Sequence, residues 1–282
     1  MSRIAFLGTG LLGSGMIESM LRRGLQVTVW NRTLAKARAL EPLGAVVAET
    51  PEQAVAGADE VHIILSDDAA VDALVERIAA HVPASAVVVD HTTTSPVGTK
   101  ARLQRAEARG LRYVHAPVFM GPAMARESKG VMMVSGPAAL YEQVQGTLAG
   151  MAADVWYLGE REELAAALKI FGNSMLFQMT AGIADIFAMA KNLGVSPQEA
   201  ISVFDRFNAG AAIVGRAKKV ASGDLSASFE LDMARKDMRL MIEAAGDVPL
   251  VSLPSIAKRM DDAIAAGHGK DDMGAIAAGT IS

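Results

Sequence analysis

A glycine-rich segment at residues 8–13 reads Gly-Thr-Gly-Leu-Leu-Gly and fits the pattern G-x-G-x-x-G. It follows an apolar strand predicted at 4–7 and precedes a helix predicted at 16–23. That strand–turn–helix context is what a dinucleotide-binding turn requires. A glycine-rich turn that binds nothing is the alternative, and the context disfavours it.

Each residue of this turn has a distinct expected task. Gly8 allows a tight turn, Gly10 lets the backbone approach a pyrophosphate, and Gly13 lets the helix pack closely on the strand. Leu11 and Leu12 lie at the start of the helix, whose N-terminus offers free N–H groups and the positive end of its dipole. We therefore predict that all five residues contact a dinucleotide.

The next predicted strand, at 26–30, ends in Asn31-Arg32-Thr33. NAD sites usually carry an acidic residue here for the ribose hydroxyls, whereas an arginine accommodates the 2′-phosphate of NADP. This chain has no acid at that place, and Arg32 offers a planar, permanently charged fork. The sequence predicts NADP as the cofactor, with Asn31, Arg32 and Thr33 in contact with it. A solvated surface arginine is the alternative.

Lys169 and Asn173 lie four residues apart on a predicted helix at 164–193, so their side chains share one face. The apolar neighbours, among them Ile170, Phe171 and Met175, predict that this helix is mostly buried. Burial would lower the pKa of the lysine and make it a usable proton donor or acceptor. The alternative is a lysine that reaches solvent from the helix edge beside a hydrogen-bonded core amide.

Apolar strands alternate with amphipathic helices up to about residue 160. Strands are predicted at 4–7, 26–30, 45–47, 61–65, 87–90, 112–114, 131–135 and 154–157. This alternation favours an α/β Rossmann domain with a doubly wound parallel sheet. After the long helix at 164–193, further helices are predicted at 199–207, 231–245 and 255–266. We predict an NADP-binding domain at 1–160, an all-helical substrate and dimerisation domain at 161–282, and one long interdomain helix.

Composition narrows the class of protein further. The 282 residues carry 27 Lys and Arg against 31 Asp and Glu, and cysteine is absent. We expect no nucleic-acid partner, no membrane partner and no thiolate chemistry, and a cytoplasmic location. The five histidines show no metal-ligand spacing, so no metal is predicted. His62 is expected to be a core residue, and His91 to lie near the cofactor ribose.

Five segments, in the right order, resemble the β-hydroxyacid dehydrogenase family. That family includes 3-hydroxyisobutyrate dehydrogenases and glyoxylate/succinic semialdehyde reductases, with a nucleotide domain of the 6-phosphogluconate dehydrogenase type. The matching segments are 6–16 with 27–33, Leu65-Ser66-Asp67, the loop Asp90–Pro96, Lys169–Asn173, and Phe229 with Lys236-Asp237.

The resemblance implies a role for each of these segments. Lys169 would be the catalytic residue, and Asn173 would bind or orient the substrate. The backbone of Leu65 and Ser66 would lie along the cofactor, with Thr93 near its nicotinamide ribose. From the helical domain, Phe229 and Lys236 would also reach the cofactor. The resemblance also implies a homodimer or homotetramer.

One segment departs from the family pattern. Where relatives read Asp-Ala-Pro-Val-Ser-Gly-Gly, this chain reads His-Ala-Pro-Val-Phe-Met-Gly at 115–121. The bulky Phe119 and Met120 replace a serine and a glycine that would hold a substrate carboxylate. With Gly121, they are predicted to contact the substrate.

The sequence therefore predicts an NADP-dependent oxidoreductase that interconverts a small aldehyde or ketone and its alcohol. Hydride transfer builds negative charge on the substrate oxygen, and Lys169 would act as general acid or base. Two alternatives remain open. One is an imine reductase-like enzyme on apolar substrates, and the other is a non-catalytic NADP-binding protein.

Overall fold

The computed structural model describes residues 2–281 and divides into two compact units, one ending at Asn173 and the next beginning at Ser174. This division falls inside one helix, α8 (Leu164–Leu193), whereas the sequence analysis placed the boundary at 160/161. Lys169 and Asn173 consequently belong to the same unit as the glycine-rich turn.

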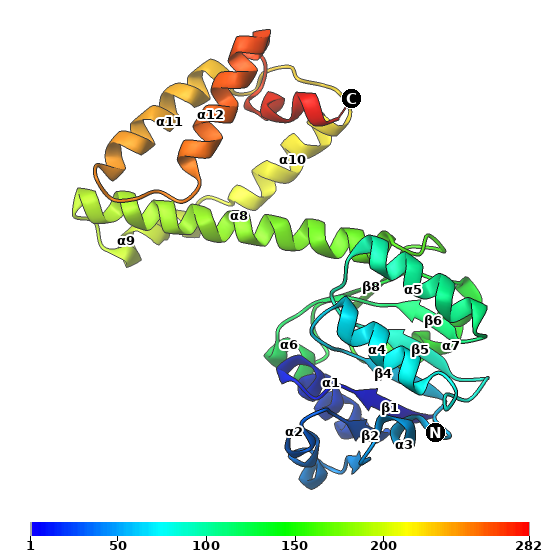
Figure 1. The fold of residues 1–282 in the computed structure, drawn as a ribbon. Helices are drawn as coiled ribbons and strands as arrows, with labels where there is room; N and C mark the ends of the chain where they lie inside the picture. Colours follow the sequence, from blue (N-terminus) through cyan, green and yellow to red (C-terminus); the bar gives the residue numbers. More distant parts are fainter. Residues whose placement is uncertain (1, 282) are drawn as a thin grey trace. The chain divides into compact units, whose positions relative to one another are not determined.

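The first unit contains a parallel six-stranded sheet in the order β3-β2-β1-β4-β5-β6 (Figure 1). Its strands are β1 (Arg3–Leu7), β2 (Gln26–Trp30), β3 (Val46–Val47), β4 (Glu60–Ile63), β5 (Val87–Asp90) and β6 (Arg112–His115). The strand order reverses direction between β1 and β4, and ligands bind at such a point, beyond the carboxyl ends of the strands. The predicted doubly wound Rossmann sheet is confirmed.

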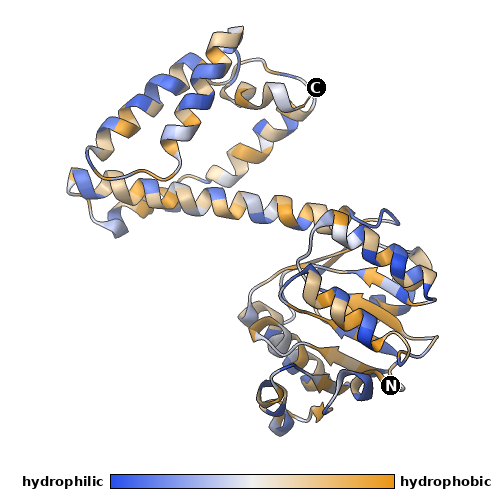
Figure 2. Cartoon of the chain, viewed as in Figure 1, coloured by the Kyte–Doolittle hydropathy of each residue, from blue (hydrophilic) through white to orange (hydrophobic). Residues whose placement is uncertain are grey.

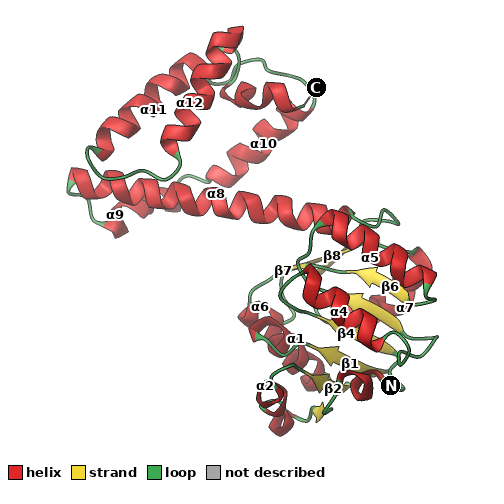
Figure 3. Ribbon diagram, viewed as in Figure 1, coloured by secondary structure: helices red, strands yellow, loops and turns green. Residues whose placement is uncertain are grey.

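Helices cover both faces of this sheet (Figure 3). They are α1 (Leu11–Arg22), α2 (Leu34–Arg38), α3 (Pro51–Val55), α4 (Asp68–Ile78), α5 (Pro96–Ala108), α6 (Pro122–Arg126) and α7 (Ala138–Ala149), with a 3₁₀ turn at Glu41–Leu43. Capping residues fix several starts. Asp67 accepts from the Ala70 N–H at α4, and Ser95 accepts from the Gly98 N–H at α5. The acid pair Asp67–Asp68 therefore lies at the start of a helix.

Strand residues point alternately into two apolar cores. On one face Ile4 and Phe6 of β1 pack with residues of α1, α2 and α7. On the other face Ala5 and Leu7 pack with residues of α3, α4 and α5. Figure 2 shows the resulting concentration of apolar residues along the strands. Because both faces are covered, the strands read as nearly continuous apolar runs.

The first unit also contains a second sheet, which has three strands. It has the order β7-β8-β9, formed by β7 (Val118–Phe119), β8 (Val131–Val134) and β9 (Asp154–Tyr157). β7 and β8 are antiparallel, and β8 and β9 are parallel. The strands β8 and β9 agree with the strands predicted at 131–135 and 154–157, whereas β7 and α6 were not predicted. Both are too short, at two and five residues, to show a periodicity.

A buried arginine fixes the carboxyl end of β5. Arg102 of α5 is 1% exposed and forms ion pairs with Asp68 at 2.9 Å and Asp72 at 2.6 Å. It also lies 3.6 Å from the fully buried Asp90, which accepts a hydrogen bond from the Tyr113 hydroxyl at 2.9 Å. A buried charge is tolerated when it is paired in this way. The cluster therefore anchors the loop that follows Asp90.

The second unit is helical. After the rest of α8 it contains α9 (Pro197–Ile201), α10 (Ala209–Ala221), α11 (Leu231–Ala245) and α12 (Leu253–Ala263), with 3₁₀ turns at Ser202–Asp205 and Met273–Thr280 and a π turn at Ile264–His268. Its core is formed mainly by α11 and α12 with the last turn. The predicted helices are confirmed, except that α10 was missed and the helix predicted at 199–207 is split in two.

The prediction that α8 is mostly buried is wrong for the single chain. Phe171 is 63% exposed, Met175 is 48% exposed and Phe177 is 72% exposed. The sequence pattern shows that a helix is apolar, but it does not show which protein surface covers it. Among the helices of residues 2–281, none is long and apolar enough to cross a membrane.

Candidate active site

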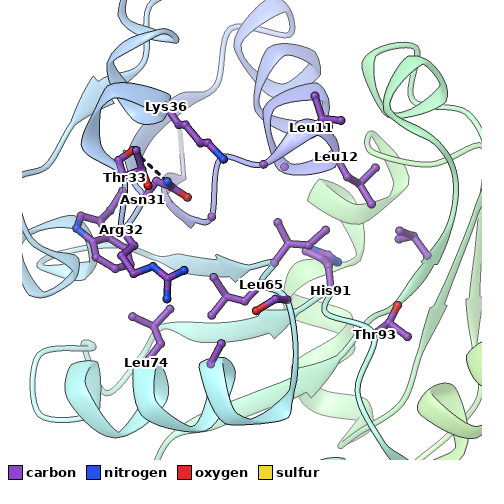
Figure 4. A pocket seen from close by; sticks show the side chains of 18 of the residues that line it. Leu11, Leu12, Asn31, Arg32, Thr33, Lys36, Leu65, Leu74, His91 and Thr93 are labelled. Carbon is purple, nitrogen blue, oxygen red and sulfur yellow. Dashed lines mark hydrogen bonds between the residues drawn. The ribbon is translucent and has the colours of Figure 1, made fainter.

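A cavity of about 750 Å³ lies beyond the carboxyl ends of the central strands of the first unit (Figure 4). It brings together most of the predicted site residues. Those that line it are Gly8, Gly10, Leu11, Leu12, Gly13, Asn31, Arg32, Thr33, Leu65, Ser66, Thr93, Met120 and Lys169. The glycine-rich turn, the end of β2, the β4 and β5 loops and the start of α8 thus meet in one place.

The glycines of the turn are required by close approaches of the backbone. Gly8 has a φ of +111°, and a Cβ there would lie 2.0 Å from the Ile64 carbonyl oxygen. A Cβ on Gly13 would lie 2.1 Å from the Gly8 carbonyl oxygen. A Cβ on Gly10 would meet nothing within 4 Å, so the space in front of Gly10 is open. This is the arrangement predicted from the G-x-G-x-x-G spacing.

The start of helix α1 fits a bound pyrophosphate. Helix α1 begins after Gly10, which has no side chain to cap the first N–H groups. The Thr9 N–H donates to Asn31 Oδ1 at 3.1 Å and so links the turn to the end of β2. Free N–H groups at a helix N-terminus are suitable donors for phosphate oxygens.

The far end of the cavity is basic. Arg32 and Lys36 extend from the end of β2 and from α2 toward the cavity (Figure 4). Arg77 of α4 also lines it, held by Glu52 and stacked over the Trp30 ring at 5.9 Å. Arg77 lowers the pKa of Glu52 to about 2, which keeps this carboxylate charged. The end of the cavity therefore favours an anionic group on its ligand.

The loop after β5 is held in place by hydrogen bonds. Thr92 Oγ1 accepts from the Leu65 N–H at 3.0 Å, and the Thr92 N–H donates to Asp90 at 2.9 Å. These bonds join the β4 loop to the β5 loop, so that Leu65, Ser66 and Thr93 line one wall of the cavity. Because Asp90 is anchored, its hydrogen bond to Thr92 also fixes the loop that lines the ligand site.

Lys169 is buried although its helix is largely exposed. The residue is 9% exposed, and its Nζ donates to Asn173 Oδ1 at 3.0 Å. Nζ also lies 4.1 Å from the centre of the Phe119 ring. Burial lowers the pKa of the Lys169 ammonium, and no carboxylate pairs with it among residues 2–281. The predicted buried lysine with a helical Asn neighbour is what the structure contains.

Phe119 has room beside Lys169 because residue 172 is glycine. A Cβ on Gly172 would lie 2.2 Å from the Phe119 ring. The aromatic side chain therefore fills the space over the start of α8 and shields the ammonium on one side. Gly121 precedes α6 and does not line the cavity.

Two predicted cofactor contacts lie in the second unit. Phe229 precedes α11, and Lys236 lies on α11 in an ion pair with Asp237 at 2.8 Å. Their roles toward the cofactor remain predictions. Within residues 2–281, no group of three or more His, Asp or Glu side chains is arranged to hold a metal ion.

Sequence reasoning missed several residues that line the cavity. Trp30, Lys36, Ile64, Ala70, Ala73, Leu74, Arg77 and Val118 were not predicted. Lys36 had a recognisable signal, because it lies one helical turn after Arg32 and Thr33. Arg77 had none, because α4 and β2 come together only in the folded sheet.

Comparison with known families gives a consistent result. Residues 3–159 match the model of the NAD binding domain of 6-phosphogluconate dehydrogenase. Residues 164–279 match the NAD-binding domain of NADP-dependent 3-hydroxyisobutyrate dehydrogenase. The chain belongs to the β-hydroxyacid dehydrogenase family and is an NAD(P)-dependent oxidoreductase of that group.

Two of the similar individual proteins are named as a dehydrogenase or a reductase, and a third as a nuclear factor. The chain is 26% identical to 2-(hydroxymethyl)glutarate dehydrogenase of Eubacterium barkeri, over 97% of this chain and 93% of that one. It is 27% identical to the chloroplastic glyoxylate/succinic semialdehyde reductase 2 of Arabidopsis thaliana, over 87% and 69%. It is 28% identical to the cytokine-like nuclear factor N-PAC of Xenopus tropicalis, where it spans 87% of this chain but only 46% of the relative.

Among solved structures, a reductive aminase from Aspergillus terreus resembles this chain closely in fold. It has a TM-score of 0.89 and 25% identity, and the match covers 99% of both chains. That structure shows the reductive aminase in complex with NADPH4, cyclohexanone and allyl amine.

The basic end of the cavity yields a test of cofactor preference. Arg32→Ala should raise the Kd for NADPH about ten- to a hundredfold, since a lost charge-assisted contact to phosphate is worth roughly 1.5–3 kcal/mol. The Kd for NADH, which lacks the 2′-phosphate, should change little. Fluorescence titration measures both constants. Arg38→Ala, in the helix α2 that follows Arg32, is the control, because Arg38 is paired with Glu49. Wild-type protein that binds NADH more tightly than NADPH would contradict the assignment.

Proposed function

We propose that this protein is an NADP-dependent reductase that interconverts a small aldehyde or ketone and its alcohol, with Lys169 as the general acid and base. The observation that carries this proposal is the buried Lys169 ammonium in the wall of the dinucleotide cavity. A lysine is seldom buried without a function or an opposite charge.

The geometry assigns a task to each hydrogen of the lysine. NADPH, when bound, supplies a hydride to the carbonyl carbon, and the carbonyl oxygen then gains negative charge. One N–H of Lys169 is used by Asn173 Oδ1, and the face of the ammonium toward Phe119 is occupied by the ring. The remaining direction is available to a substrate oxygen. The lysine stabilises the developing charge there and then gives up its proton.

The lowered pKa of Lys169 suits this task. Burial disfavours the charged form, so the ammonium releases its proton more readily than an exposed lysine would. Reduction needs the protonated amine, and its rate should fall as the pH rises through the pKa of Lys169. Oxidation of the alcohol needs the neutral amine, and its rate should fall as the pH is lowered through the same pKa.

NADP is favoured over NAD by the residues at the end of β2. Asn31 uses its side chain within the protein, accepting from Thr9 and donating to the Thr33 carbonyl at 3.0 Å. Arg32 and Lys36 are exposed and directed to the cavity. Two cations, with no acidic residue at the end of β2 itself, suit a 2′-phosphate.

The substrate end of the cavity favours an uncharged molecule. Phe119 and Met120 replace the hydroxyl and small side chain by which relatives would hold a carboxylate, and Met120 lines the cavity. An anion with too few partners in an apolar pocket is costly. We therefore infer a preference for an aldehyde or ketone with an alkyl or aryl group at that end.

Reduction of imines is the second candidate. The reductive aminase from Aspergillus terreus has the same fold at 25% identity. An apolar surface formed by Phe119 and Met120 would suit the hydrocarbon part of an imine substrate. Lys169 argues against this candidate, because a cationic amine would repel an iminium ion. A third candidate, a non-catalytic NADP-binding protein, rests on the similarity to N-PAC, which is named as a nuclear factor.

We also propose that the chain forms a homodimer or homotetramer. Along α8, the apolar residues Phe171, Phe177 and Met179 are each more than half exposed in the single chain. Contiguous exposed apolar surface of this kind usually marks an interface. Sedimentation equilibrium should give a mass of two or four chains, and a monomer at micromolar concentration would contradict the proposal.

Removing the lysine tests the chemistry directly. Lys169→Ala should reduce kcat for carbonyl reduction by about 10²–10⁴, the usual contribution of a general acid, while the Kd for NADPH stays nearly unchanged. Lys191→Ala, an exposed lysine on the same helix, is the matched control. A Lys169→Ala enzyme with near-normal turnover would show that the residue has a structural task.

A substrate panel separates the three candidate functions. NADPH oxidation is measured with uncharged aldehydes and ketones, with keto acids and aldehyde acids of equal length, and with cyclic imines. We expect kcat/KM to be at least tenfold higher for the uncharged carbonyls, and Phe119→Ser with Met120→Gly to narrow that gap. Preference for the carboxylates would overturn the substrate assignment, preference for imines would favour the second candidate, and no turnover would favour the third.

A further inference from the structure

A chain of hydrogen bonds crosses the apolar core behind the cavity. Glu60 Oε2 lies 3.1 Å from His62 Nε2, and His62 Nδ1 lies 2.9 Å from His91 Nε2. At one end the Thr147 hydroxyl donates to Glu60 Oε1 at 2.8 Å. At the other end His91 Nδ1 lies 2.8 Å from the Ala116 carbonyl oxygen. Three titratable residues that the proposed reaction does not use are thus joined in one line.

The three side chains joined by these hydrogen bonds are all buried. Glu60 is 6% exposed, His62 is 0% exposed and His91 is 1% exposed. The two imidazole rings are stacked at 5.3 Å, and Phe6 of β1 stacks on the His62 ring at 5.7 Å. Phe6 and His62 are direct partners in the pairing of β1 with β4. Packing therefore fixes the ring planes, and the hydrogen bonds determine which nitrogens carry protons.

The positions of the protons follow from one end of the chain. A carbonyl oxygen only accepts, so His91 Nδ1 must carry a proton. Burial, together with the neighbouring His62, lowers the pKa of His91 to about 3, so this ring is neutral and its Nε2 is an acceptor. His62 Nδ1 must then donate to it. One further proton lies between His62 Nε2 and Glu60, whichever of the two holds it.

This order has a consequence for the cavity. His91 lines the cavity, but both of its nitrogens are already used by His62 and Ala116. His91 can therefore contact the cofactor ribose, as the sequence predicts, only through its ring carbon atoms. The Nδ1–H of His91 instead donates to the Ala116 carbonyl. This carbonyl belongs to the backbone that leads to Pro117, Val118 and Phe119.

We propose that Glu60, His62 and His91 are positioning residues that hold the Ala116 carbonyl and thereby place Phe119 against Lys169. Ala116 lies between β6 and β7, and Phe119 ends β7, with its ring 4.1 Å from the Lys169 ammonium. Backbone bonds hold the same loop: the Ala116 N–H donates to the Asp90 carbonyl at 2.7 Å, and the Pro117 carbonyl accepts from the Met133 N–H at 3.0 Å. The bond from His91 adds a partner for the Ala116 carbonyl, next to a proline that has no N–H to donate. The effect on catalysis rests on the proposed function of Lys169, but the order of the hydrogen bonds does not.

The first test reads the protons without turnover. Two-bond ¹⁵N–¹H spectra of the histidine-labelled full chain distinguish the two neutral tautomers, and single His→Phe variants assign the signals. We expect His91 to be neutral at pH 7 with its proton on Nδ1, and His62 to carry a proton on Nδ1. A proton on Nε2 of His91 would overturn the proposal even if the enzyme reduces no substrate.

The second test measures positioning. His91→Phe keeps a stacked ring but removes the donor to Ala116, and it should lower kcat at least tenfold while the Kd for NADPH changes less than threefold. Glu60→Gln keeps a donor for His62 and an acceptor for Thr147, so its kcat should stay within threefold of wild type. Glu60→Leu removes both groups and should behave as His91→Phe does.

The exposed His81→Phe is the control. Thermal unfolding reports whether each variant folds, and kcat is compared for folded protein. A folded His91→Phe or Glu60→Leu with wild-type kcat would overturn the proposal. If His91→Phe does not fold, the contrast between Glu60→Gln and Glu60→Leu decides, and equal losses in both variants would also overturn it.

Discussion

One buried ammonium group without an opposite charge is the constraint on which this active site depends. A cation taken out of water normally has a carboxylate beside it, and Lys169 has an amide oxygen and an aromatic ring. These neutral partners stabilise the charge only partly, so the pKa of the lysine is lowered by its burial. The same features that make the residue costly for stability make its proton available for transfer.

The rest of the first unit holds this ammonium group in a fixed position relative to the ligand cavity. The parallel sheet brings the glycine-rich turn, the end of β2 and the β5 loop to one edge. Two buried polar clusters then fix the loops at that edge. The ion pairs of Arg102 anchor Asp90 and the loop after β5, and the Glu60–His62–His91 chain ends on Ala116 in the loop after β6. Polar groups in an apolar core fix positions because each must keep its partner.

Much of this arrangement could be predicted from the sequence, because it depends on local patterns. The G-x-G-x-x-G turn, the missing acid after β2 and the four-residue spacing of Lys169 and Asn173 are all visible along the chain. Contacts between distant elements were not predictable in this way. Arg77 enters the cavity from α4, the Phe119 ring fits only because Gly172 has no side chain, and His62 meets His91 across neighbouring strands. The exposure of α8 was missed because hydrophobicity does not identify the surface that covers a helix.

The most direct test of the central claim is the titration of Lys169 itself. The pKa of its ammonium can be measured by ¹³C and ¹⁵N NMR of lysine-labelled protein, with Lys169→Arg used to assign the signal. We expect Lys169 to titrate at a clearly lower pH than the exposed lysines of the chain. Asn173→Asp, which supplies a carboxylate at the same place, should raise its pKa again. A Lys169 signal that titrates together with the exposed lysines would contradict the account.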